Sequence, residues 1–252
     1  MAIIKEKEKK KVVKILADLK NPVKLIMFTQ EFECESCKVA RDLLTELSRL
    51  SDKLSLEFRD FAEDKELVEK YGVDKIPALI VEGDRDYGIK YYGVPSGYEF
   101  AALLQDILDV GRRDPNLPED IKEHLAQVDQ PVHLQVMTTA LCPFCPVMVR
   151  LAHKFAMASD LIKADQVEIS HFPTIAVKYN VQGVPVLVIN EKLVLPGVHP
   201  DIEIAHRILE VIGKEEATPV VPAPAEGQPE QALTPVANPA APQAGGPDPV
   251  QS

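Results

Sequence analysis

The sequence predicts an α/β protein made of two tandem copies of one unit, and three observations support this prediction. Strand-like apolar runs alternate with amphipathic helix-like runs from residue 4 to residue 212. Each half of the chain places two cysteines, separated by two residues, between its first strand and the helix that follows. In addition, several residues recur at one constant spacing, which indicates an internal duplication.

The constant spacing is 108 residues (142 − 34). It separates Cys34 from Cys142, Tyr71 from Tyr179, and Pro77 from Pro185. The segments around this tyrosine and proline also align, YGVDKIPALIV at 71–81 with YNVQGVPVLVI at 179–189. Further on, the spacing falls to 104 (197 − 93) between two Gly-Val pairs, so the first unit holds four more residues (108 − 104) in its last hairpin. The predicted domains are 1–113 and 114–216, each a mixed central sheet flanked by helices.

The first unit is predicted to run helix, strand, helix, strand, helix, strand, strand, helix. Its opening helix places Val12, Leu16 and Leu19 on one apolar face. Its third helix is expected to end at Gly72, because glycine favours a left-handed helix end. The expected helices span 4–19, 38–50, 63–71 and 97–110, and the expected strands span 23–29, 54–61, 78–81 and 88–92.

The stretch 111–118 contains glycine and prolines and predicts a linker, after which the same order begins again. The expected helices of the second unit span 119–128, 147–158 and 200–212, with a helical stretch that ends at Tyr179. The expected strands span 132–138, 164–170, 186–190 and 192–195. Residues 217–252 hold nine of the 21 prolines. Because such a segment cannot bury enough apolar surface to offset its ordering entropy, a disordered tail is predicted.

The bulk composition excludes several classes of function. The net charge is −11, which argues against nucleic acid as a partner, because phosphate binding needs a basic surface. No apolar run approaches the roughly 18 residues that span a bilayer, and residues 1–20 lack the apolar core of a secretory signal. A cytoplasmic location without membrane association is therefore expected. In that reducing compartment, paired cysteines more often bind metal or cycle between thiol and disulfide than staple a fold.

The motifs together resemble a known fold. A CxxC pair at a strand-to-helix turn, followed 37 residues later (71 − 34) by Tyr-x-Val-x-x-(Ile/Val)-Pro and a strand, resembles the thioredoxin fold. Two such units, the second with Cys-Pro-Phe-Cys, resemble the glutaredoxin-like protein disulfide oxidoreductases. The resemblance covers residues 1 to about 215. It implies that the protein reduces, forms or exchanges disulfides in protein substrates, with a thioredoxin-reductase-type electron donor and without a cofactor.

Thiol–disulfide exchange needs an attacking thiolate and a second thiol that resolves the mixed disulfide. The first cysteine of each pair lies near a helix N-terminus, where unpaired N–H groups and the helix dipole favour its anion. Cys142 and Cys34 are therefore the expected nucleophiles, and Cys145 and Cys37 the expected resolving thiols.

The resemblance also implies cis peptide bonds before Pro77 and Pro185, against the CxxC loops. A cis bond reorients the backbone of the preceding residue, so that residue can pair with an extended substrate strand beside the disulfide. The expected substrate-binding residues are Ile76, Pro77, Val184 and Pro185.

The two sites differ in charge. Glu31, Glu33 and Glu35 surround Cys34, whereas no charged residue lies between Gln135 and Val149. A carboxylate ~8 Å away, at an effective dielectric of ~20, disfavours a thiolate by roughly 2 kcal/mol before salt screening. We therefore expect a higher thiol pKa at Cys34 and expect the Cys142 pair to face the substrate, with the first pair slower or serving as an internal relay.

The sequence departs from the thioredoxin pattern in front of each pair. No tryptophan precedes the cysteines, and Phe28 and Val136 occupy the position where thioredoxin has a buried carboxylate. Proton transfer to the resolving cysteine must then use another acid or water, and the candidate acids are Asp60, Glu63 and Glu168.

Three alternatives to a protein disulfide oxidoreductase stay open at this point. Glutathione-linked exchange is one, because Cys-Pro-Phe-Cys is glutaredoxin-like. Structural zinc on the cysteines is another, although the gap between the pairs is far longer than the roughly 15–20 residues usual between zinc-binding pairs, and no metal site is expected. The third is a module that only presents a peptide-binding groove.

Overall fold

The computed structural model describes residues 3–31 and 34–216, so the predicted disordered tail, 217–252, lies outside the described residues. Its strands are β1 (Val23–Thr29), β2 (Leu54–Asp60), β3 (Ala78–Glu82), β4 (Asp86–Tyr92), β5 (Val132–Thr138), β6 (Ile162–Glu168), β7 (Val186–Ile189) and β8 (Leu193–Pro196). Its helices are α1 (Glu6–Leu16), α2 (Glu35–Ser48), α3 (Lys65–Tyr71), α4 (Tyr98–Arg112), α5 (Glu119–Leu125), α6 (Cys145–Ala158), α7 (Pro173–Lys178) and α8 (Asp201–Val211). The predicted order of elements is confirmed in both halves.

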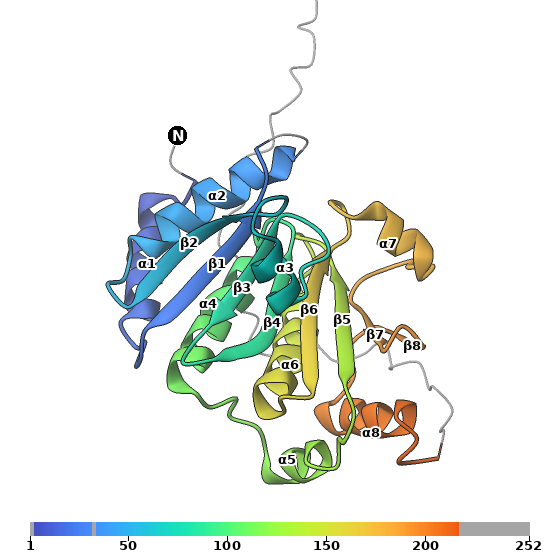
Figure 1. Cartoon of the computed structure of the whole chain (residues 1–252). Coiled ribbons are helices and arrows are strands. Elements are labelled where there is room, and N and C mark those ends of the chain that lie inside the picture. Colours follow the sequence, from blue (N-terminus) through green and yellow to red (C-terminus); the bar gives the residue numbers. More distant parts are fainter. Residues whose placement is uncertain (1–2, 32–33, 217–252) are drawn as a thin grey trace, which may run out of the picture.

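The strands form one eight-stranded sheet in the order β2-β1-β3-β4-β6-β5-β7-β8 (Figure 1). Each half contributes four neighbouring strands in the same relative order. The halves meet where β4 and β6 pair in parallel, with Ile89 opposite Ala164. Both joining strands are buried on both faces for most of their length, as expected of strands inside a continuous sheet. The sequence predicted two units but not this merger of their sheets.

The pleat of the strands divides the apolar side chains into two cores. Along β1, Leu25 and Met27 face the larger core, which α1, α2, α4, α6 and α8 cover. The alternate residues Ile26 and Phe28 face a smaller core under α3 and α7. With one core on each face of the sheet, the helices on both faces pack against it. The loops that lead into α2 and α6 therefore lie between a packed strand and a packed helix.

The linker prediction is wrong at its start. Helix α4 continues through Gly111 and Arg112, and the chain leaves it at Arg113, which has a positive φ of 61°. Gly111 lies inside α4 and lets the helix approach Leu19 closely, because a Cβ at this position would lie 2.3 Å from the Cδ1 atom of Leu19. Asn21 also donates its side-chain N–H to the Gly111 carbonyl oxygen at 2.9 Å. Glycine at this position therefore marks a close approach between elements, not a break in the helix.

A buried polar network joins α4 of the first half to α6 of the second. Asp106 accepts a hydrogen bond from the hydroxyl of Tyr91 and lies 2.6 Å from Nδ1 of His153, which has no exposed surface. Arg150 donates to Asp109 at 2.6 Å. These hydrogen bonds offset part of the desolvation cost inside the apolar core, although Nε2 of His153 and Nε of Arg150 are buried without a hydrogen-bond partner among the described residues. The network keeps α4 and α6 in register, and both helices begin beside the second CxxC loop.

Within the described ranges, no helix is both long enough and apolar enough to cross a membrane.

Candidate active site

Both cysteine pairs are closed disulfides at the strand-to-helix turns where the sequence placed them. The S–S distances are 2.02 Å for Cys34–Cys37 and 2.19 Å for Cys142–Cys145. The first pair follows β1 and begins α2, and the second follows β5 and begins α6. The second cysteine is more deeply buried in each pair, because Cys37 is 2% exposed and Cys145 is 0% exposed. This burial fits the expected resolving thiols.

The helix N-terminus points at the sulfur in the second site. The backbone N–H of Cys145 donates to the Sγ atom of Cys142 at 3.0 Å. This residue is the first of α6, so the hydrogen bond comes from the positive end of the helix dipole. A helix N-terminus in this position is a favourable place for an anionic sulfur.

In the first site, the equivalent N–H is used differently. The Cys37 N–H donates to the backbone carbonyl oxygen of Cys34 at 3.2 Å. The Sγ atom of Cys34 lies 4.0 Å from the Ser36 hydroxyl. Glu31 and Glu35 are exposed beside this site, and the third glutamate in the charge argument, residue 33, lies outside the described residues. Of the two expected nucleophiles, Cys34 is the more exposed, so exposure alone favours attack at the first site, whereas the helix N-terminus favours the second.

Both predicted cis bonds are present, at Ile76–Pro77 and Val184–Pro185. The carbonyl oxygen of Val184 lies 3.7 Å from the Sγ atom of Cys142, so the backbone before Pro185 adjoins the second disulfide. On the other side, Gly197 donates its N–H to the Pro185 carbonyl oxygen at 2.8 Å. The predicted residues of the second site, which are distant in sequence, are therefore brought together.

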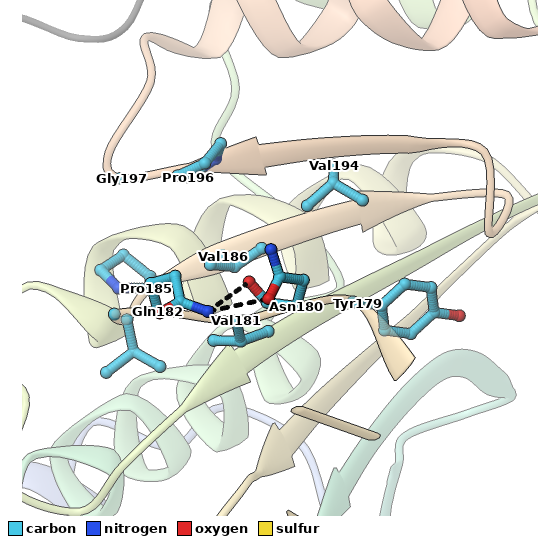
Figure 2. Close-up of a pocket in the computed structure, with 11 residues that line it drawn as sticks. Tyr179, Asn180, Val181, Gln182, Pro185, Val186, Val194, Pro196 and Gly197 are labelled. Carbon is cyan, nitrogen blue, oxygen red and sulfur yellow. Dashed lines mark hydrogen bonds between the residues drawn. The ribbon is translucent and has the colours of Figure 1, made fainter. Parts of the chain in front are cut away.

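A groove runs beside the second cis-proline (Figure 2). It has a volume of about 320 Å³ and is lined mainly by apolar and backbone atoms from the segment after α7 and from β7 and β8. Its lining residues are Tyr179, Asn180, Val181, Gln182, Gly183, Val184, Pro185, Val186, Val194, Pro196 and Gly197. Large apolar side chains are also exposed near the CPFC loop, with Leu141 at 73% and Val147 at 45%. Apolar surface around a reactive disulfide suits an extended polypeptide.

The equivalent place in the first unit is covered. Gly93 bonds to the Pro77 carbonyl oxygen as Gly197 bonds to that of Pro185. A Cβ built on Gly93 would lie 2.8 Å from Cβ of Glu168 and 2.9 Å from Nδ1 of His171, both in the second half of the chain. By contrast, apart from its two neighbours in the chain, no described residue lies within 4 Å of a Cβ built on Gly197. The joining of the two sheets thus covers the first groove and leaves the second open.

The structure reveals a buried acid near the second site that the sequence reasoning missed. Glu99, in the first turn of α4, is 0% exposed. Its Oε1 accepts hydrogen bonds from Thr138, the last residue of β5, and from Gln166 at 2.9 Å. Its Oε2 is buried without a hydrogen-bond partner among the described residues. Burial raises the pKa of Glu99 to about 8, and the charge of Glu168 adds to this rise, whereas the hydrogen bonds from Thr138 and Gln166 oppose it.

Glu99 lies behind the second CxxC loop although it belongs to the first half. The N–H of Tyr98 donates to the Ala140 carbonyl oxygen at 3.1 Å, two residues before Cys142. Gly97 permits this contact, because a Cβ there would lie 2.2 Å from that same oxygen. A signal was present in the sequence: Glu99 shares the helical stripe of Leu103, as i and i+4 neighbours. An acid on an apolar stripe indicates a buried, partnered or functional carboxyl.

The three acids considered from sequence have other roles in the structure. Asp60 accepts hydrogen bonds from the N–H groups of residues 62 and 63 and thereby caps a turn. Glu63 is exposed. Glu168 lies 2.6 Å from His171; burial raises its pKa, but the hydrogen bond and charge of His171 outweigh burial and hold the pKa below its ordinary value. Glu99 is therefore the described acid best placed to hold a proton near neutral pH behind Cys142.

Comparison with known proteins identifies the fold. Residues 132–210 match the family model described as a thioredoxin domain. The crystal structure of a protein disulfide oxidoreductase from Aeropyrum pernix K1 superposes with a TM-score of 0.79 at 26% identity, covering 85% of this chain and 96% of that one. The chain consists of two tandem thioredoxin folds. Its two CxxC disulfides lie at the strand-to-helix turns of these two folds, as the sequence resemblance implied.

A second group of similar proteins consists of alkyl hydroperoxide reductase subunits and NADH dehydrogenases. A structure of the alkyl hydroperoxide reductase subunit AhpF of Enterococcus faecalis gives a TM-score of 0.77 at 24% identity, covering 82% of this chain and 99% of that one. The corresponding alkyl hydroperoxide reductase of Escherichia coli is 27% identical over 177 residues, which cover 70% of this chain and 32% of that protein. A Bacillus subtilis NADH dehydrogenase is 22% identical over 159 residues, 29% of its length. The chain thus spans about a third of the length of these curated relatives.

Proposed function

We propose that the chain is a thiol–disulfide oxidoreductase whose second site, Cys142 and Cys145, acts on disulfides in proteins. The Cys142 thiolate attacks a substrate disulfide and releases one substrate thiolate, which takes up a proton. Cys145 then attacks Cys142 in the mixed disulfide, releasing the second substrate thiol and closing the Cys142–Cys145 disulfide. The substrate gains two electrons and the dithiol loses two. The observation that carries the proposal is the open groove beside cis-Pro185, with the Val184 backbone next to the attacking sulfur.

For the first site we propose a different place in the same reaction. The first site also has both cysteines, Cys34 and Cys37, but the position equivalent to the open groove is packed against Glu168 and His171. A small or intramolecular partner would still reach Cys34, which is partly exposed. We therefore propose two domains, residues 1–113 and 114–216. The first site then acts either as a slower site or as a relay that exchanges disulfides with the second.

We further propose that a separate reductase supplies the electrons. The relatives carry the names reductase and NADH dehydrogenase, and each extends far beyond the part that this chain matches. A thioredoxin-reductase-type donor fits this pattern. A cytoplasmic location fits it as well, because a reducing compartment would hold the CxxC pairs as dithiols between turnovers.

Substrate recognition through apolar surface gives a direct test against glutathione-linked exchange. We expect Leu141→Ser with Val147→Ser to raise the KM for insulin reduction by roughly tenfold, because losing part of the burial of two large side chains weakens binding by about 1–2 kcal/mol. The rate with glutathione disulfide, a small and polar substrate, should change less than about twofold. Steady-state kinetics with both substrates, at one temperature and ionic strength, measure this.

The first unit supplies a matched control. Val39 occupies the position equivalent to Val147 (147 − 108) and is exposed to nearly the same extent, 44% against 45%. Val39→Ser should leave both rates unchanged. If the double substitution of Leu141 and Val147 instead lowers the rate with glutathione disulfide as much as the rate with insulin, the protein-substrate proposal is wrong. That result would favour glutathione-linked exchange.

A further inference from the structure

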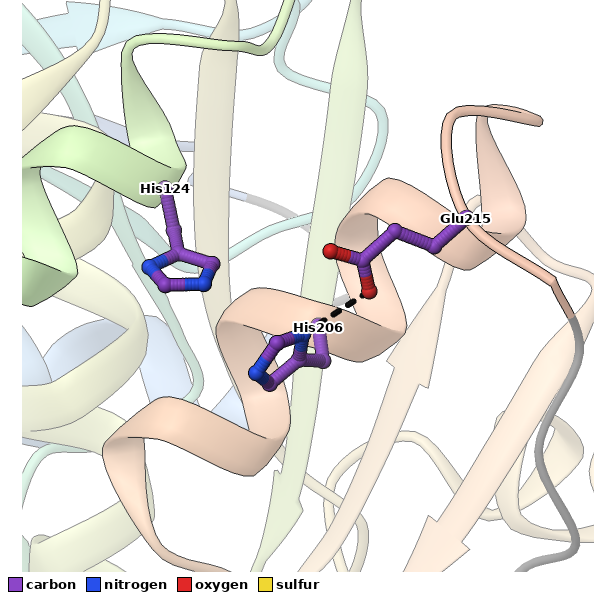
Figure 3. Close-up of side chains that lie close together, drawn as sticks. All are labelled: His124, His206 and Glu215. Atoms are coloured by element: carbon purple, nitrogen blue, oxygen red, sulfur yellow. Dashed lines mark hydrogen bonds and ion pairs between the residues drawn. The ribbon is translucent and has the colours of Figure 1, made fainter.

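Two histidines and a glutamate meet on the surface far from either disulfide in sequence. His124 lies near the end of α5, His206 lies on α8, and Glu215 lies in the turn that follows α8 (Figure 3). Helix α5 is the first element after the linker, and α8 is the last helix of the described chain. The three side chains therefore connect the beginning of the second unit with its end.

The geometry of these three side chains is that of a nearly formed metal site. One ligand atom from each residue lies within 4.8 Å of the other two. The imidazole centroids are 4.6 Å apart, and Nδ1 of His206 lies 2.8 Å from Oε2 of Glu215. In tetrahedral zinc sites the ligand bonds of about 2.0–2.2 Å place ligand atoms ~3.4 Å apart. Rotation of side chains that are at least partly exposed closes this gap without movement of the backbone.

The hydrogen bonding of His124 prepares it as a ligand. Its Nδ1 lies 2.7 Å from the backbone carbonyl oxygen of Asp120. A carbonyl oxygen only accepts, so Nδ1 carries the hydrogen and Nε2 presents its lone pair. Metal-binding histidines are oriented in this way by a carbonyl or carboxylate behind the ring. The carboxylate of Glu215 adds the negative charge that two neutral imidazoles lack.

We propose that His124, His206 and Glu215 form a binding site for one divalent cation of the zinc class. Imidazole suits zinc and its transition-metal neighbours, whereas Mg²⁺ and Ca²⁺ prefer oxygen ligands alone. Two nitrogens, one carboxylate oxygen and a water complete a tetrahedron. Bound metal ties the turn after α8 to α5 and thereby holds the second unit closed at its end. This site is separate from the cysteines, whose sulfurs are in disulfides in this form.

The test uses the full-length protein, purified without a polyhistidine tag and with both disulfides closed, so that no thiolate competes for metal. Isothermal titration calorimetry with zinc chloride should show saturable binding of one Zn²⁺ per chain. The melting temperature should rise by several degrees at saturating zinc, because the metal binds only the folded state. Magnesium chloride at the same concentration should produce neither effect.

Three variants locate the site, and a fourth is the matched control. His124→Gln, His206→Gln and Glu215→Gln should each weaken zinc binding by roughly tenfold or more, since even loss of a group behind a ligand costs that much. His171→Gln, a partly exposed histidine paired with Glu168, should leave zinc affinity unchanged. Absence of saturable binding in the parent protein would overturn the proposal. Equal affinity in the parent and the three site variants would overturn it too, by placing the zinc elsewhere.

Discussion

Replacing Cys142 by serine is expected to lower the rate of insulin-disulfide reduction by roughly 100-fold or more, because it removes the attacking thiolate. Cys34→Ser is expected to retain at least about half of the activity. The difference follows from three features of the second site: the Cys145 N–H aimed at the Cys142 sulfur, the neighbouring Val184 backbone, and the open groove. Turbidity assays with dithiothreitol as the electron source measure both variants under the same conditions.

Interpretation of this experiment depends on separating chemistry from stability. Serine is nearly isosteric with cysteine, and each variant should unfold near the parent's midpoint when all proteins are compared in their reduced forms. Cys37→Ser serves as the control for loss of any one thiol from the chain. Equal losses in Cys142→Ser and Cys34→Ser would show that the covered groove of the first unit is no barrier to substrate, and the assignment of roles would be wrong.

Glu99→Gln is expected to change how stability depends on pH. In the unfolded chain this carboxyl titrates near its ordinary value of 4.5, whereas burial raises its pKa to about 8 in the folded protein. Between these values the folded state holds a proton that the unfolded state has lost, so the contribution of Glu99 to stability falls as pH rises and levels off above pH 8. One pKa unit corresponds to about 1.4 kcal/mol, so the full loss is at most about 5 kcal/mol.

Urea denaturation of both proteins at pH 5 and pH 8 measures this effect. Glutamine carries no titrating proton, so the stability of the parent relative to the variant should fall by at least about 2 kcal/mol across that range. Titrating groups that do not interact with Glu99 cancel in the difference. A difference between parent and Glu99→Gln that is independent of pH would contradict the raised pKa.

Glu99 also bears on turnover. The resolving thiol Cys145 is 0% exposed, so its proton cannot pass freely to bulk water. A carboxyl that changes charge near pH 8 behind the same loop is suited to exchange that proton, as general acid–base groups work best with a pKa near the operating pH.

Local sequence patterns were sufficient to predict the order of helices and strands, because in each unit the apolar periodicity, the turn residues and the repeated motifs indicate the same elements. The run 23–29 and its counterpart 132–138 have the predicted ends, and Gly72 ends α3 in a left-handed conformation. The resemblance to the thioredoxin fold, which the repeated cysteines and prolines carry, implied both cis bonds. These features depend on neighbours in sequence or on the duplication. The linker was predicted to begin at Gly111, and this was wrong because sequence alone does not distinguish a glycine that permits close packing from a glycine that ends a helix.

The difference between the two sites could be predicted only in part, because one of its causes is visible in the sequence and the other arises from contacts between the two halves. The charge difference is visible in the residues around Cys34, but the covering of Gly93 by Glu168 and His171 arises only when β4 pairs with β6. The placement of Glu99 behind Cys142 depends on the same contact between halves. Nothing in the duplicated pattern distinguishes two separate sheets from one continuous sheet, because both bury the same alternating residues.

The most direct measurement of the central claim is the position of the mixed disulfide. A chain carrying Cys37→Ser and Cys145→Ser retains both nucleophiles but cannot resolve an intermediate. After brief reaction of this variant with an excess of a disulfide-containing protein, acid quenching and peptide mass spectrometry identify which sulfur holds the substrate. Substrate attached predominantly to Cys142 is the predicted result. Substrate attached equally or predominantly to Cys34 would contradict it.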